Sequence, residues 1–74
     1  MEIRERLSFN MRRLRQSKSW SQEELGHQSG IHRTYISDLE RGARNPTIQV
    51  VERIAVALGV PCGELLDPPA RKSG

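Results

Sequence analysis

Hydrogen-bonding side chains recur at helical spacing between residues 33 and 41. If Ile36 and Leu39 face a core, a turn of 100° per residue directs the polar positions outward. These outward positions are Arg33, Thr34, Ser37, Asp38 and Arg41. Arginine and hydroxyl side chains in such an arrangement can bond to base edges and phosphates. The segment therefore predicts a helix that reads the major groove of double-stranded DNA.

Individual positions suggest different contacts. Arg33, in the first turn, can donate two hydrogen bonds to O6 and N7 of guanine, or bind a phosphate instead. Thr34 can offer its methyl group to thymine or its hydroxyl to a base, and Ser37 is a shorter, more permissive contact. Asp38 leaves three alternatives open: it accepts from cytosine N4, it repels wrong sites, or it pairs with Arg41.

Residues 21–41 supply the elements that position this helix. Ser21 is a good N-cap, and Glu24 three residues later completes a capping box. Gly26 is expected where two helices cross closely, and Gly30 ends the first of them. The second helix is expected over residues 33–40. Two short helices around a glycine turn are the layout of a helix-turn-helix unit.

Four further residues are expected to position the DNA backbone: Gln22, Tyr35, Arg44 and Asn45. Gln22 lies at a helix N-terminus, where free N–H groups favour phosphate. The Tyr35 ring can pack while its hydroxyl reaches a phosphate. Arg44 and Asn45 follow the helix in a loop, where they can grip the backbone or enter the minor groove. Asn45 has the alternative role of organising the loop before a proline.

The rest of the chain reads as three more helices, over residues 2–17, 48–58 and a short segment after Pro61. Ile3, Leu7, Met11 and Leu14 form one apolar stripe on the first. The 48–58 segment carries apolar residues on every side, so we expect it to be the most buried element. The fold class is all-α with five helices. We expect a single domain over residues 1–67 and a disordered tail over 68–74.

Composition narrows the class of protein to which the chain can belong. The chain has 74 residues, a net charge of +3 and one cysteine, Cys62. A single cysteine excludes an intramolecular disulfide framework and suits a cytoplasmic protein. No apolar run is long enough for a membrane span, and we expect no membrane association. His27 and His32 lack the paired spacing of a zinc site, so no metal or cofactor is expected. No nucleophile–base pair or phosphate loop suggests an enzyme.

Several motifs in register resemble the XRE/Cro-type helix-turn-helix family, whose fold is that of the phage λ repressor. They are Ser-Gln-Glu-Glu-Leu at 21–25, Gly-Ile at 30–31, Leu-Glu-Arg-Gly at 39–42 and Arg-Ile-Ala-Val-Ala-Leu-Gly-Val at 53–60. Residues 32–37 and 40–45 are also similar to controller proteins of restriction–modification systems. The resemblance implies a largely buried ion pair between Arg15 and Glu40. It also implies an acidic contact to RNA polymerase at Glu23, whose alternative role is to complement the helix dipole.

We therefore expect a transcriptional regulator that acts as a homodimer on a palindromic operator. The resemblance to controller proteins implies that this operator lies in the promoter of the protein's own gene. The dimer surface is expected around Val60, Leu65 and Leu66, because the DNA-reading helix must stay free. A second hypothesis is an antitoxin or another protein-interaction module on the same fold. RNA binding is disfavoured because the three aromatic residues do not cluster into a stacking platform.

Overall fold

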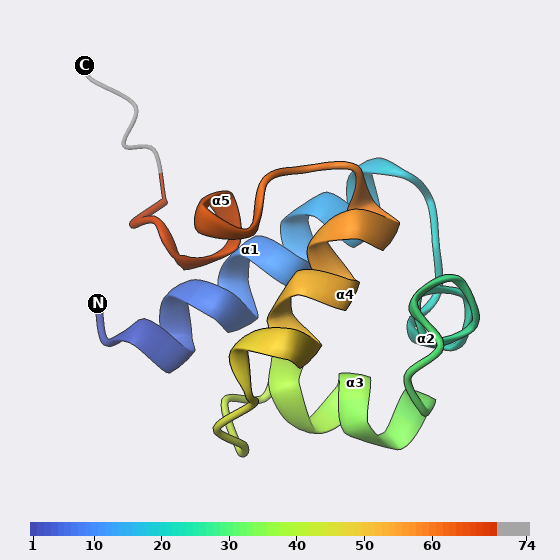
Figure 1. Ribbon diagram of the computed structural model, residues 1–74, viewed down its shortest axis with the longest axis horizontal. Coiled ribbons are helices and arrows are strands. Elements are labelled where there is room, and N and C mark those ends of the chain that lie inside the picture. The colour runs from blue at the N-terminus through green and yellow to red at the C-terminus, as the bar shows by residue number, and fades with distance from the viewer. Residues whose placement is uncertain (70–74) are drawn as a thin grey trace.

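The computed structural model describes residues 1–69 and confirms the expected fold class. Five helices follow one another: α1 (Ile3–Ser17), α2 (Gln22–Ser29), α3 (Arg33–Glu40), α4 (Ile48–Leu58) and α5 (Cys62–Leu66), with no strand among the described residues. Figure 1 shows α2 and α3 joined by a short turn at one end, α4 crossing the middle, and α5 beside α1. Residues 70–74 of the expected tail lie outside the described part.

Helix boundaries follow the capping residues. Ser21 Oγ accepts from the Glu24 N–H at 3.0 Å, but the Glu24 carboxylate accepts from Gln28 at 2.6 Å instead of closing the predicted capping box. A complete capping box does form at α1, between Glu2 and Glu5, where none was predicted. Local hydrogen bonds of this kind satisfy the first free N–H groups of a helix.

The core lies where α1, α2, α3 and α4 meet, with α5 closing one side. Its buried apolar side chains are Leu7, Met11, Leu25, Ile31, Ile36, Leu39, Val51, Ile54, Ala55, Leu58 and Leu65. Trp20 packs against this cluster from just before α2, as a residue preceding an N-cap commonly does. Burial of these side chains is the main stabilising contribution to a domain of this size.

The predicted stripe on α1 and the predicted burial of α4 are partly wrong. Ile3 is 51% exposed, and Ile48 and Val56 are 80% and 68% exposed. Spacing of eight residues places Ile48 and Val56 on one face of α4, and the packing against α2 and α5 leaves that face uncovered. An apolar residue count cannot distinguish a helix buried all round from one with an uncovered apolar face.

The α2–α3 turn requires the glycine that the sequence places at position 26. A Cβ atom on Gly26 would lie 2.6 Å from the carbonyl oxygen of Ile31 and 3.3 Å from the backbone nitrogen of Arg33. Both are backbone atoms, so a side chain could be accommodated only by moving α3. Ser29, which is buried beside this turn, donates from Oγ to the Leu25 carbonyl at 2.7 Å.

Candidate nucleic-acid interface

Glu40, the last residue of α3, fixes that helix to its neighbours. Its side chain is 2% exposed, and its two carboxylate oxygens accept from Arg15 Nε at 2.7 Å and Nη2 at 2.9 Å. Gln22 Nε2 donates to the same carboxylate at 3.0 Å. The hydrogen bonds with Glu40 raise the pKa of the Arg15 guanidinium above its ordinary value. The ion pair implied by the family resemblance is therefore present, and it ties α1 and α2 to α3.

The backbone of Glu40 carries a second set of contacts that sequence reasoning missed. Its carbonyl oxygen accepts from Ser8 Oγ at 2.6 Å and from Arg12 Nη2 at 2.7 Å. Both donors lie on α1, and Ser8 is buried. A carbonyl at a helix C-terminus lacks an intrahelical partner, so these donors satisfy it. They also hold the C-terminal end of α3 against α1.

The opposite face of α3 is open. Arg33, Thr34 and Arg41 are exposed, and Ser37 and Asp38 are half-buried. These five residues and Gln22 line one shallow depression on the surface, so the predicted base-contacting side chains are brought together. Gln22 differs from expectation in one respect, because its amide nitrogen is engaged by Glu40. A phosphate contact by Gln22 stays a prediction.

The structure shows what Asp38 bonds to within the chain. Oδ1 accepts from Arg41 Nη2, and Oδ2 accepts from Arg44 Nε at 3.0 Å. These bonds, with Arg44 contributing most, lower the pKa of the Asp38 carboxyl. The Arg44 guanidinium also stacks on the Tyr35 ring, 4.6 Å from its centroid. Of the three alternatives, pairing with Arg41 is present, and Arg44 is a second partner that the sequence did not suggest.

Asn45 is the one predicted DNA contact that lies apart from this group. It is exposed and borders an apolar groove with Ile3 and Leu66 rather than the depression on α3. Its predicted contact to the DNA backbone is not tested by this placement.

The N-terminus of α3 is capped by an unusual residue. His32 Nδ1 accepts from the Thr34 N–H at 3.1 Å, a role more often filled by serine, threonine or aspartate. Glu23 and His27 border the same turn from α2. Within residues 1–69, no three or more His, Cys, Asp or Glu side chains lie close enough to hold a metal ion.

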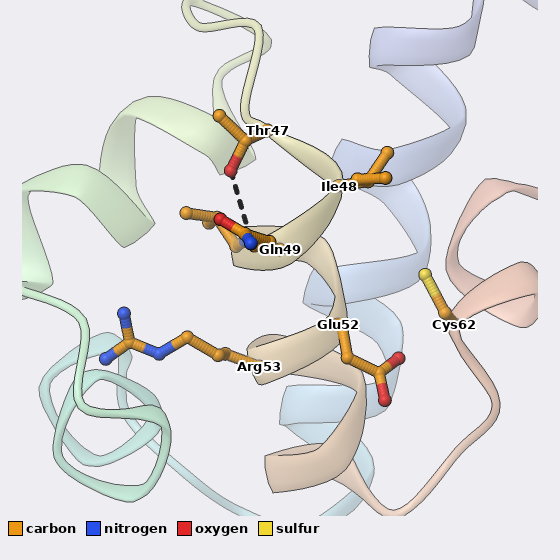
Figure 2. Close-up of a pocket in the computed structure, with 7 residues that line it drawn as sticks. Thr47, Ile48, Gln49, Glu52, Arg53 and Cys62 are labelled. Atoms are coloured by element: carbon orange, nitrogen blue, oxygen red, sulfur yellow. Dashed lines mark hydrogen bonds between the residues drawn. The ribbon is translucent and has the colours of Figure 1, made fainter.

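A second depression lies on α4, apart from the open face of α3 (Figure 2). Figure 2 shows Arg53 directed to one side, while Ile48, Glu52 and Cys62 lie on the other, so its polar groups do not converge on one point. Thr47 caps the helix there, accepting from the Val50 N–H at 3.2 Å. Arg53 Nη2 donates to the Gly30 carbonyl at 2.7 Å, which links α4 to the α2–α3 turn.

The predicted dimer surface needs one correction. The Leu65 side chain is fully buried in the core, so it cannot belong to a surface between two copies of this fold. Its carbonyl accepts from the buried Asn10 Nδ2 at 2.9 Å, which holds α5 against α1. Val60 and Leu66 are half-buried and pack at the edge of the core.

No helix of the described chain has the length and apolar character needed to cross a membrane.

A short glycine turn, a tethered second helix and an open hydrogen-bonding face on that helix define a helix-turn-helix DNA-binding domain. The chain belongs to the helix-turn-helix family HTH_3, of the XRE type, whose profile matches residues 11–65. This places it among the helix-turn-helix transcriptional regulators.

Three relatives illustrate the similarity. Control protein C.BamHI from Bacillus amyloliquefaciens is 52% identical over 58 residues, which cover 77% of this chain and 72% of that protein. The structure of a hypothetical transcription factor from Neisseria superposes with a TM-score of 0.90 at 47% identity, covering 92% and 78% of the two chains. The restriction–modification controller protein C.Esp1396I, solved as a tetramer with its natural 35 base-pair operator, gives a TM-score of 0.80 at 36% identity, covering 89% and 91%.

Proposed function

We propose that the protein is a sequence-specific transcriptional regulator that binds a palindromic operator as a homodimer. The observation that carries this proposal is the division of α3 into two faces. Ile36, Leu39 and Glu40 are buried, whereas Arg33 and Thr34 are exposed and free to meet base edges. In helix-turn-helix proteins this end of the second helix enters the major groove.

A controller protein of a restriction–modification system is the finer assignment that we propose. The similarity to C.BamHI and to the operator-bound C.Esp1396I supports it. A regulator of this kind would bind the promoter of its own gene. Occupancy of that site would then depend on the concentration of the protein and on how its copies assemble.

We assign the dimer surface to the exposed face of α4, extended by Val60 and Leu66. Ile48 and Val56 are the most exposed large apolar residues among those in the helices. Single exposed apolar residues are common, whereas apolar residues that adjoin one another on a surface can mark an interaction site. A dimer formed through this face would also leave α3 of each copy free. Each α3 could then bind one of two half-sites that lie one helical turn apart.

We also assign Glu23 as a contact to RNA polymerase. It is exposed at the second position of α2, next to Gln22, and borders the α2–α3 turn. A regulator bound beside a promoter could present this carboxylate to a neighbouring protein. Its alternative role, stabilisation of the helix dipole, is worth about 0.3–1 kcal/mol.

The test compares Arg33→Ala with Arg13→Ala, which removes the same charge from an exposed position on α1. Binding is measured to the duplex upstream of the protein's own gene and to a random duplex of equal length. Arg33→Ala should weaken the first by about 1–3 kcal/mol and the second little. Arg13→Ala should change both slightly and equally.

Equal losses on the two duplexes would make Arg33 a phosphate contact. A wild-type protein that binds the upstream duplex no better than the random one would contradict the proposed function. In that case a role as an antitoxin or interaction module would be favoured.

A further inference from the structure

Asp38 is an acidic residue in the middle of a surface expected to meet phosphates. Each of its two carboxylate oxygens accepts from a different arginine, Arg41 at the C-cap of α3 and Arg44 in the following loop. We propose that Asp38 determines specificity by acting as an internal substitute for phosphate, which holds both arginines until a matching base pair engages it. This inference rests on the proposed function and deepens it.

The geometry suits an exchangeable bond. A carboxylate offers a guanidinium the same pair of oxygen acceptors as a DNA phosphate. The Arg41 and Arg44 side chains remain 65% and 50% exposed, so each has donors open to solvent while it is bound to Asp38. Exposed ion pairs of this kind are weak and are readily exchanged for another anion. The stacking on Tyr35 keeps Arg44 beside α3.

The proposed exchange distinguishes right from wrong sites. On any duplex, a phosphate must compete with Asp38 for each arginine. On a matching site, Asp38 gains a hydrogen bond from the N4 amino group of a cytosine, which compensates for the arginines that it releases. On random DNA a released carboxylate would gain no such partner and would lie unpaired beside phosphates, so the two arginines stay on Asp38 and are withheld from the DNA backbone. This pairing therefore lowers affinity selectively for wrong sequences.

The first experiment measures binding of wild type and Asp38→Asn to a random duplex over a range of salt concentrations. Asparagine keeps the shape of the side chain but cannot hold two cations. We expect affinity for random DNA to rise about 3- to 20-fold at low salt, since two exposed pairs are released. The salt dependence should steepen by about one to two units of slope, because each new phosphate contact adds about 0.9.

Asp67→Asn is the matched control. It makes the same chemical change at an exposed position just after α5, which packs on α1 and α4 and away from the face of α3. This control reports the effect of one unit of net charge. An increase for Asp38→Asn no larger than for Asp67→Asn would overturn the proposal.

A second comparison separates internal pairing from simple repulsion of DNA by the carboxylate. Asp38→Asn is introduced into the double variant Arg41→Ala/Arg44→Ala. If Asp38 acts by holding the arginines, the substitution should now change random-duplex affinity no more than the Asp67→Asn control does. An undiminished increase would show direct repulsion and would refute the exchange.

A measurement without DNA keeps this inference distinguishable from the proposed function. In the NMR spectrum of the free protein, the Nε–H proton of Arg44 should exchange with water at least several-fold more slowly in wild type than in Asp38→Asn. Equal exchange rates would show that the pair does not form in solution. Slow exchange combined with no binding of wild type to any duplex would instead contradict the proposed function alone.

Discussion

Replacement of Glu40 by alanine should be among the most destabilising single changes in the chain. The substitution removes an acceptor that takes two hydrogen bonds from Arg15 and one from Gln22. Arg15 would keep only its bond to the Trp20 carbonyl, 2.8 Å long, while its side chain is 12% exposed. A guanidinium left in that position is poorly hydrated and has lost its counter-ion.

The expected loss is about 3–5 kcal/mol, the usual effect of removing one partner of a buried pair. Stability of about 0.05–0.15 kcal/mol per residue gives a 74-residue chain roughly 4–11 kcal/mol in total. Glu40→Ala would thus remove a large part of it and lower the Tm by about 12 °C or more. An exposed pair would change stability by less than about 1 kcal/mol.

Urea unfolding followed by circular dichroism and by the fluorescence of Trp20, the single tryptophan, measures this loss. Gln16→Ala, at an exposed position in α1 outside the proposed DNA and dimer surfaces, is the control and should change stability by less than about 0.5 kcal/mol. The apolar double variant Arg15→Met/Glu40→Leu should be less destabilised than Glu40→Ala, because no charge is left buried. If Glu40→Ala and Gln16→Ala unfold at the same urea concentration, the Arg15–Glu40 pair does not contribute to stability as a buried ion pair would.

Three further predictions concern the turn, activation and assembly. Gly26→Ala should destabilise the fold by about 1–3 kcal/mol, because its Cβ would meet backbone at 2.6 Å, whereas Gly63→Ala, with open space around it, should be neutral or slightly stabilising in thermal melts. Glu23→Gln should keep normal operator affinity but lose activation in a reporter assay at matched occupancy; retained activation would return Glu23 to a helix-dipole role. Val56→Glu should leave the fold intact but weaken self-association in sedimentation experiments. If the variant sediments with the same molecular mass as the wild type, the dimer surface lies elsewhere.

Helix positions could be predicted because local signals determine them. Ser21, Gly30, Thr47 and Gly59 mark helix ends by capping or left-handed geometry, and each does so in the structure. Such signals depend on bonds within a few residues, so the chain alone contains them. The capping box of α1 was missed because glutamate is not among the residues that usually cap a helix through the side chain.

The tertiary contacts were harder to predict. Exposure of Ile48 and burial of Leu65 depend on which helix faces are covered by neighbours, and periodicity does not report that. The partners of Asp38 depend on how two long arginine side chains fold back over α3. The Arg15–Glu40 pair was anticipated only through the family resemblance, because residues separated by 25 positions along the chain leave no local sign of their pairing.

The two faces of α3 have a consequence for how such a protein can change. Arg33 and Thr34 donate no side-chain hydrogen bond within the described chain, so the fold does not depend on their identity. If Arg33 and Thr34 contact base edges as proposed, substitutions there would alter the preferred operator with little effect on folding. Asp38 is constrained differently, because a new residue at that position would also change the pairing of two arginines. New operator preferences should therefore arise first through the N-terminal turn of the helix.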